Sequence, residues 1–208
     1  MRSFVKFAFG AMAFFVAGDA AAVTVFTTDR AAFEASNTIT ITEDFEGIGV
    51  GPGAVAVLSD PIDFSGFTFQ SSGGGGIVGL GDGLFGPTQR LAANTFAQVL
   101  EIVFPAGITA FGLDLFSNDD SPITLEVFDT SNGLLGSFTV ATNGTTPAFL
   151  GVTTDTDIGQ VIVNDGPSGG IIDNISAGTV AAIPLPGGIL LILSAFAGLM
   201  VAGRKRLA

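Results

Sequence analysis

Short apolar runs rich in β-branched and aromatic residues recur along the chain, separated by clusters of Gly, Pro, Asn, Asp and Ser. In Ile123–Val127, apolar and polar residues alternate, so the apolar side chains share one face of an extended segment. Regular runs of this kind predict an all-β domain, a sandwich of two antiparallel sheets. The expected strands are Thr38–Glu46, Ile62–Gln70, Val99–Phe104, Ile108–Phe116, Ile123–Asp129, Leu134–Val140, Ala148–Thr153, Gln160–Asn164 and Ile171–Ala177.

Three segments of the body depart from the strand pattern. Thr28 can cap a short helix that runs through Asp29–Phe33. Ser71–Gly86 is rich in glycine, and we expect a long loop there. Gly178–Ala182 is expected to be a short linker that leaves the last strand.

The N-terminal 22 residues have the layout of a secretory signal peptide. A basic start (Met1–Lys6) precedes an apolar run (Phe7–Gly18) that is too short to span a bilayer comfortably. Ala20 and Ala22 form an A-x-A cleavage site, so we expect the mature chain to begin near Val23. The alternative is an uncleaved N-terminal anchor.

The C-terminal segment, residues 179–208, has the layout of a membrane anchor. The motif Pro184-Leu185-Pro186 is followed by an uncharged apolar stretch over Gly187–Gly203, for which we predict a single transmembrane helix. The basic cluster Arg204-Lys205-Arg206 belongs on the cytoplasmic side of the membrane. The body, residues 23–178, is therefore expected to face outward, and the precursor to be held in the inner membrane facing the periplasm.

These three parts in this order resemble the PEP-CTERM group of sorting signals, in its VPLPA-type variant. The resemblance covers the end of the chain and departs from the variant at Ile183 and Gly187. It implies that an exosortase recognises Pro184, Leu185 and Pro186, cuts nearby, and passes the protein to the cell surface of a Gram-negative bacterium that makes exopolysaccharide. An ordinary C-terminal anchor is the alternative.

The distribution of charge limits the possible partners of the body. Between residues 23 and 183 there are two basic residues, Arg30 and Arg90, and 18 acidic ones, so this stretch carries a charge of −16. Such a surface repels nucleic acid and anionic lipid and attracts cations such as Ca²⁺. The chain has no Cys and no His, which excludes disulfides, cysteine-based metal sites and the commonest general base.

The body also resembles the jelly-roll domains found with this sorting signal, which are similar to galactose-binding-like and carbohydrate-binding modules. The resemblance rests on Asp44–Gly47, Phe149–Thr153 and Ile171–Ile175. It implies a structural Ca²⁺ held by an acidic residue of the first core strand, Glu46 with Asp44 as the alternate, and by Asp173 of the last strand. Physically, two carboxylates at a sheet edge repel each other unless a cation or a proton relieves them. The alternative is that these carboxylates are simply solvated.

Two catalytic motifs occur without the surroundings that they need. Gly166–Gly170 matches G-x-S-x-G, but the chain has no His to activate the serine. Gly81–Gly86 matches G-x-G-x-x-G, but Pro87 follows and no helix pattern does. We therefore expect no enzyme, but a structural or binding protein of the cell surface or biofilm matrix. A carbohydrate-binding module for the cell's own exopolysaccharide is the alternative, and a hydrolase is the least favoured, because Trp and Tyr, the usual sugar-stacking residues, are absent.

Overall fold

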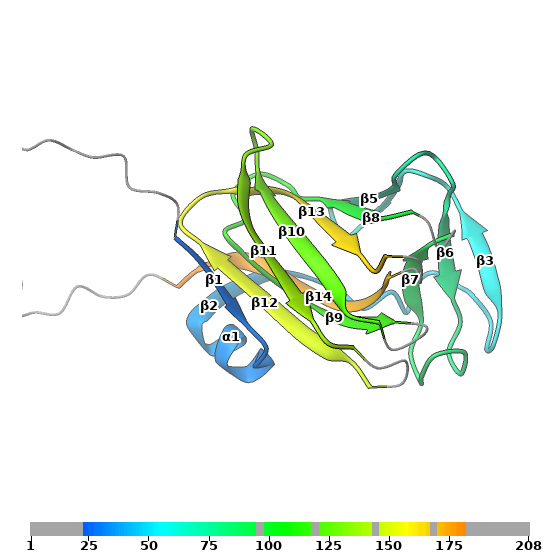
Figure 1. The fold of residues 1–208 in the computed structure, drawn as a ribbon. Helices are drawn as coiled ribbons and strands as arrows, with labels where there is room; N and C mark the ends of the chain where they lie inside the picture. The colour runs from blue at the N-terminus through cyan, green and yellow to red at the C-terminus, as the bar shows by residue number, and fades with distance from the viewer. Residues whose placement is uncertain (1–22, 95–97, 118–120, 143–145, 167–169, 182–208) are drawn as a thin grey trace, which may run out of the picture.

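The computed structural model describes residues 23–94, 98–117, 121–142, 146–166 and 170–181. These residues form two antiparallel sheets that pack face to face, with one short helix on the outside (Figure 1). This arrangement confirms the prediction of an all-β sandwich. The predicted signal peptide, with Ala20 and Ala22, and the predicted sorting segment from Ala182 onward lie outside the described residues.

The larger sheet has eight strands and the smaller has six. In order across the eight-stranded sheet lie β1 (Thr24–Thr27), β12 (Ala148–Thr154), β9 (Ala110–Ser117), β14 (Gly170–Val180), β7 (Arg90–Ala93), β6 (Ile77–Leu80) and β3 (Val55–Leu58), with β2 (Asn37–Glu43) paired to β14. The six-stranded sheet runs β11 (Leu134–Val140), β10 (Ile123–Asp129), β13 (Ile158–Asn164), β8 (Leu100–Val103), β5 (Phe67–Ser71) and β4 (Ile62–Phe64).

The core between the sheets follows from the alternation in the sequence. On β10, Ile123, Leu125 and Val127 are fully buried, whereas Thr124 and Glu126 stay partly exposed on the outer face. Aliphatic side chains make up most of the main core cluster, and five buried phenylalanine rings add bulk without needing hydrogen-bond partners. Several of these rings meet edge to face, the geometry favoured by the aromatic quadrupole.

The helix begins one residue later than predicted. Helix α1 spans Arg30–Ser36, and its N-cap is Asp29, not Thr28: Asp29 Oδ1 accepts a hydrogen bond from the backbone N–H of Ala32 at 3.0 Å. A carboxylate caps a helix at least as well as a hydroxyl does, and Asp29 directly precedes the first helical residue.

Phe33 anchors α1 to the outer face of the eight-stranded sheet. Its ring is 1% exposed and tilts against the ring of Phe149, with 5.7 Å between the ring centroids. The ring lies over Gly112 of β9 and Gly151 of β12, where a Cβ atom would approach it to 3.1 and 2.7 Å. The two glycines therefore form the depression into which the helix docks.

The single strand expected over Ile62–Gln70 is in fact a hairpin. β4 and β5 are joined by the two-residue turn Ser65-Gly66, and both turn residues have positive φ, 49° and 90°. Two positive φ angles are typical of the tight turns that match the twist of paired strands. Apolar and polar residues alternate in the same way on both sides of the turn, so the sequence resembles a single strand.

The glycine-rich segment Ser71–Gly86 forms the predicted loop only in part. It contains β6, whose four residues are all buried between β3 and β7. A Cβ atom on Gly79 would lie 2.9 Å from the side chains of Ile48 and Val50, so glycine here allows a chain to pass close to the strand. Glycine at this position thus serves close packing, and its low strand propensity explains why β6 was not predicted.

The other differences lie at the ends of the body and in its shortest elements. The strands β1, β3 and β7 were not predicted, and each has only four residues. β14 continues through Val180, because the expected linker pairs with β2 up to Asn37. Within the described part of the chain, no helix has the length and apolar character needed to cross a bilayer.

Candidate functional site

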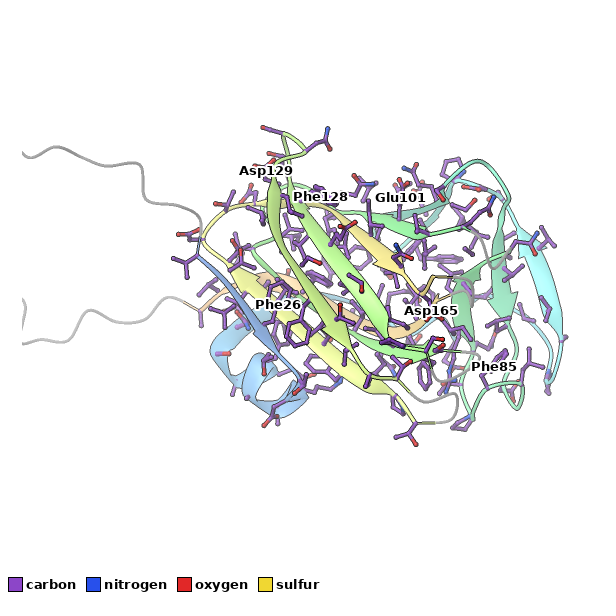
Figure 2. All side chains as sticks on the ribbon, in the orientation of Figure 1. Phe26, Phe85, Glu101, Phe128, Asp129 and Asp165 are labelled. Atoms are coloured by element: carbon purple, nitrogen blue, oxygen red, sulfur yellow. The ribbon has the colours of Figure 1, made fainter. Side chains whose placement is uncertain are left out.

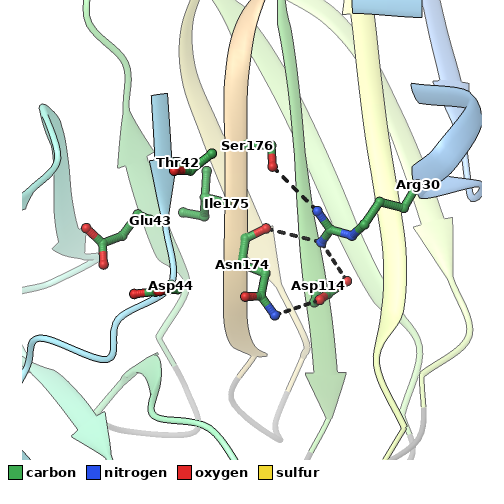
Figure 3. Close-up of a pocket in the computed structure, with 8 residues that line it drawn as sticks. All are labelled: Arg30, Thr42, Glu43, Asp44, Asp114, Asn174, Ile175 and Ser176. Carbon is green, nitrogen blue, oxygen red and sulfur yellow. Dashed lines mark hydrogen bonds and ion pairs between the residues drawn. The ribbon is translucent and has the colours of Figure 1, made fainter. Parts of the chain in front are cut away.

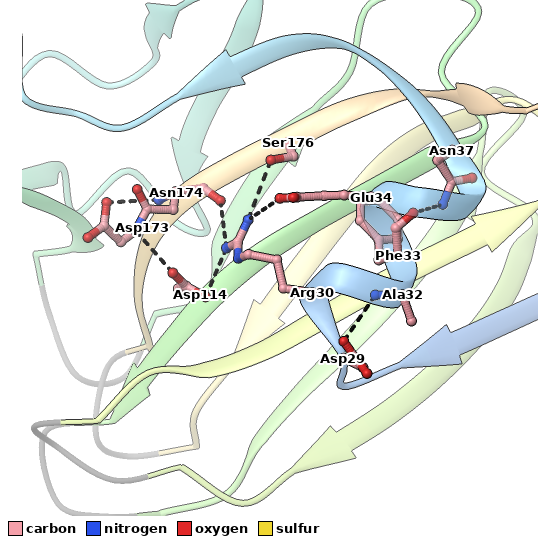
Figure 4. Close-up of polar contacts among 10 residues, drawn as sticks. All are labelled: Asp29, Arg30, Ala32, Phe33, Glu34, Asn37, Asp114, Asp173, Asn174 and Ser176. Carbon is pink, nitrogen blue, oxygen red and sulfur yellow. Dashed lines mark hydrogen bonds and ion pairs between the residues drawn. The ribbon is translucent and has the colours of Figure 1, made fainter.

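Asp173, the predicted calcium ligand of the last strand, is buried and has protein partners. Its Oδ2 accepts a hydrogen bond from Thr88 Oγ1 at 2.7 Å and lies 3.7 Å from Arg90 Nε, while its Oδ1 accepts from the N–H of Asn174 (Figure 4 shows Asp173 beside Asn174). Burial raises the pKa of Asp173 to about 6, against the opposing effects of Thr88, the Asn174 amide and Arg90.

The other two predicted ligands, Asp44 and Glu46, lie in the exposed turn after β2. Asp44 Oδ1 accepts from the N–H of Glu46, and Glu46 Oε1 accepts from the N–H of Gln89. In the ranges that the structure describes, no three acidic, His or Cys side chains come close enough to hold a metal ion. The described geometry therefore does not fit a shared site for these three carboxylates, and structural calcium stays a prediction.

A cavity lined mostly by polar residues lies beside Asp173, on the outer face of the eight-stranded sheet (Figure 3). Its volume is about 390 Å³, within the range of about 300–1,000 Å³ that is typical of small-molecule sites. We call this cavity the Asn174 pocket. It is lined by Arg30, Thr42, Glu43, Asp44, Asp114, Asn174, Ile175 and Ser176.

A β-bulge in β14 shapes the floor of the pocket. The register between β14 and β9 shifts between Asp173 and Ser176, and Asn174 has a φ of +47°. Asparagine tolerates this left-handed conformation better than most residues do. The bulge turns the Asn174 side chain toward β9, where its Nδ2 donates to Asp114 Oδ2 at 3.0 Å. Bulges often re-aim side chains near binding sites.

Arg30, the first residue of α1, forms one wall of the pocket. Its Nη2 lies 2.9 Å from Asp114 Oδ1 and donates to the carbonyl of Asn174, and its Nη1 donates to Ser176 Oγ (Figure 3). The guanidinium also lies 4.4 Å from the centre of the Phe149 ring. Because Phe33 docks α1 on the sheet, the position of Arg30 depends on that docking.

Several polar atoms of the pocket keep hydrogen-bonding capacity. Thr42 Oγ1, Asp44 Oδ2 and Asn174 Oδ1 make no hydrogen bond to another described residue. The Ser176 hydroxyl accepts from Arg30 and still has its hydrogen to donate. Both Glu43 oxygens, by contrast, accept bonds, from the N–H of Phe45 and from Ser65 Oγ. The pocket thus offers hydroxyls and acceptor oxygens to a ligand.

A second polar surface covers the outer face of the six-stranded sheet. There Glu101 of β8 accepts hydrogen bonds from Gln70 of β5 and Gln160 of β13, at 2.7 and 2.9 Å (Figure 2 labels Glu101 and, on the same sheet, Phe128). Both amides donate to the same oxygen, Glu101 Oε2, which joins three neighbouring strands. The Asn174 pocket is the stronger candidate, because its polar side chains line a cavity.

The sequence analysis identified one lining residue of the pocket, Asp44, and the adjacent Asp173, but not most of the other lining residues. Asp44 and Asp173 were singled out, whereas Arg30, Asp114 and Asn174 were not. Asp114 gives the clearest sequence signal, because it stands within the otherwise apolar run from Phe111 to Phe116. A carboxylate in such a run is buried, and a buried carboxylate needs a partner.

Comparison with known proteins assigns no family to the chain. No protein-family model matches it, and no curated protein does. Among solved structures it is similar to a family 6 carbohydrate-binding module, with 10% identity and a TM-score of 0.37 over 61% of this chain and 93% of that one. A second similar structure is the module CBM6cm-2 from Cellvibrio mixtus lichenase 5A in complex with cellotriose. It has 13% identity and a TM-score of 0.33 over 62% of this chain and 99% of that one.

A third similar structure is TmCBM61 in complex with β-1,4-galactotriose, with 15% identity and a TM-score of 0.31 over 56% of this chain and 90% of that one. These TM-scores are too low to transfer a ligand or a binding residue to this chain. The function of the chain must therefore be inferred from the geometry of its own pocket and from its sequence.

Proposed function

We propose that this chain is an exported, C-terminally sorted protein of the cell surface or extracellular matrix, whose jelly-roll body binds carbohydrate without transforming it. The observation that supports binding is the Asn174 pocket, a cavity of about 390 Å³ whose lining residues, Ile175 apart, are all polar or charged. The cell's own exopolysaccharide is the expected ligand, and an exosortase is the expected processing partner.

A carbohydrate fits the chemistry of the pocket because each sugar hydroxyl both donates and accepts hydrogen bonds. Asp44 Oδ2 and Asn174 Oδ1 can accept from ligand hydroxyls, and the hydroxyls of Thr42 and Ser176 can bond in either direction. Asp114 and Ser176 are 8% and 6% exposed, whereas Thr42 and Asp44 are exposed, so the pocket has a buried inner end and an open mouth.

A binding role agrees better with this pocket than catalysis does. Glycoside hydrolysis needs two carboxyl groups that are free to transfer a proton and to attack or activate water. Both Asp114 oxygens are engaged, by Arg30 and by Asn174, and both Glu43 oxygens accept hydrogen bonds. Of the pocket's acidic residues, only Asp44 keeps a carboxylate oxygen without a hydrogen bond to another described residue.

A glycan array probed with the full-length protein in detergent tests the binding role. The test variant is Thr42→Val combined with Ser176→Ala, which removes two pocket hydroxyls with little change of shape. Thr38→Val is the matched control, since Thr38 is an exposed residue on the same face of β2. We expect binding to at least one class of glycan that the double variant loses and the control keeps.

Failure of the wild-type protein to bind any glycan would reject the carbohydrate role and favour a purely structural matrix protein. Binding that survives in the double variant would reject the Asn174 pocket as the site.

Intact-mass analysis of protein recovered from the cell surface tests the proposed export and sorting. Cleavage after Ala22 and near Pro186 is expected to remove both terminal segments, and the mass would also reveal an attached group. Recovery of a chain that still carries residues 187–208 would contradict processing by an exosortase. Full-length chain found soluble in the cytoplasm would contradict export altogether.

A further inference from the structure

We infer that the Asn174 pocket takes a saccharide unit with a free, protonated amino group, in preference to a neutral or an acidic sugar. This inference rests on the proposed carbohydrate-binding function and narrows its ligand class. It follows from the charges that line the pocket, from the hydrogen bonds that these residues already make, and from the scarcity of cations on the body.

The charge balance of the pocket is negative. Its lining contains three carboxylates, Glu43, Asp44 and Asp114, and one guanidinium, Arg30. Arg30 already lies 2.9 Å from an Asp114 oxygen and 3.4 Å from a Glu34 oxygen. The positive charge is therefore compensated by the protein, while Glu43 and Asp44 have no cationic partner among the described residues.

An anionic sugar would find no free cation among the described residues of this region. Arg90, the second basic residue between positions 23 and 183, is 3% exposed and lies near Asp173 and over the Phe116 ring. A uronate carboxylate would have to be desolvated near three protein carboxylates, and like charges at close range repel. Moreover, Arg30 and Asn174 already donate to Asp114.

The remaining free atoms are of the chemical type that an ammonium group needs. An ammonium has three donors and no acceptor. Asp44 Oδ2 and Asn174 Oδ1 are acceptors without a hydrogen bond to another described residue, and the Thr42 hydroxyl can supply a third acceptor. Figure 3 shows Asn174 between Asp44 and Arg30, with its backbone carbonyl bonded to the guanidinium and Asp44 on the side away from it.

Isothermal titration calorimetry with three matched oligosaccharides tests this inference. The ligands share a β-1,4-linked glucan backbone and carry a 2-amino group, no charged group, or a 6-carboxylate. Full-length protein is titrated in a mildly acidic, low-salt buffer in which the amine is protonated. We expect the amino oligosaccharide to bind about tenfold more tightly than the neutral one, as one charge-assisted hydrogen bond allows, and the acidic one not to bind.

Asp44→Asn should abolish most of this preference, because it removes the carboxylate but keeps the shape of the side chain. Glu126→Gln is the control, since it makes the same change of net charge on the outer face of the other sheet. Loss of the preference in Glu126→Gln as well would reduce it to the general field of an acidic protein and overturn the inference.

The remaining outcomes separate this inference from the proposed function. Equal binding of the amino and neutral ligands, or tighter binding of the acidic one, would overturn the amino-sugar inference and leave carbohydrate binding standing. No binding of any saccharide, here and on the glycan array, would reject the proposed function itself.

Discussion

Arg90 Nε lies 3.7 Å from Asp173 Oδ2, and the two side chains are 3% and 1% exposed. The guanidinium stacks 3.4 Å from the centre of the Phe116 ring and donates to the carbonyl oxygen of Phe85. Thus the carboxylate that the sequence suggested as a calcium ligand has a buried protein cation beside it. This pair lies directly next to the bulge that shapes the Asn174 pocket.

Replacing Arg90 by methionine should destabilise the protein in a pH-dependent way. At neutral pH, Arg90→Met leaves the Asp173 carboxylate buried without a counter-charge, which costs about 3 kcal/mol of unfolding free energy. The cost should shrink in mildly acidic buffer, where Asp173 is protonated. Urea unfolding at both pH values measures the loss of unfolding free energy. An equal loss at both would contradict a stabilising attraction between Arg90 and Asp173.

The raised pKa of Asp173 predicts a distinct pH dependence of stability. The ordinary value is 3.8 and the folded-state value about 6, so in this interval the folded protein holds more protons than the unfolded chain does. The contribution of Asp173 to stability is therefore fully present below the ordinary pKa and is lost as the pH rises through about 6. Asp173→Asn should lack this loss. The unfolding free energy of the wild type should therefore fall relative to that of the variant as the pH rises through the interval. A constant difference across the interval between the two pKa values would contradict the raised pKa.

The depression that receives α1 predicts an unusual sensitivity to a single methyl group. In Gly151→Ala, the new Cβ atom would lie 2.7 Å from the Phe33 ring, and the required shift should cost about 1–3 kcal/mol. The shift also moves Arg30, so saccharide binding should weaken although residue 151 does not line the pocket. Gly47→Ala is the control, because no atom lies within 4 Å of the position that its new methyl group would take. Unchanged melting of Gly151→Ala would show that the helix is not docked as described.

The bulge at Asn174 predicts a ranked series of substitutions. Asn174→Gly accepts a positive φ and should cost no more than about 1 kcal/mol, whereas Asn174→Val should cost about 1–3 kcal/mol more, because a β-branched residue is strained there. Both variants lose the side chain that lines the pocket, so both should lose saccharide binding. The control is Asn132→Gly, which replaces a residue of similar φ, 64°, in the turn between β10 and β11. This variant should keep saccharide binding. Thermal melts and calorimetry check the order, and a valine variant as stable as glycine would contradict it.

The sandwich could be predicted well where apolar and polar residues alternate. The bounds of β10 and β11 agree with the expected runs Ile123–Asp129 and Leu134–Val140, because each of these strands has one exposed face. β6 was missed for the opposite reason. Both of its faces are buried and Gly79 removes the usual strand signal, so its pairing partners determine its structure.

The Asn174 pocket could be predicted only in part, because it joins residues that are far apart in the sequence. Arg30 and Asn174 meet through antiparallel pairing and helix docking, and no local pattern records either. The bulge depends on a register shift between β14 and β9, which the composition of β14 does not reveal. The resemblance to jelly-roll modules singled out Asp173, but its partner Arg90 emerged only from the fold.

The central claim is that a saccharide binds in the Asn174 pocket, and side-chain amide NMR tests it most directly. The full-length protein in detergent is titrated with the oligosaccharide that binds best, and the amide signals of Asn174, Gln70 and Gln160 are followed. We predict a saturable shift of the Asn174 side-chain amide with no shift of Gln70 or Gln160, which lie on the other sheet. Saturable shifts of the two glutamines with an unmoved Asn174 would place the ligand on the six-stranded sheet and contradict binding in the pocket.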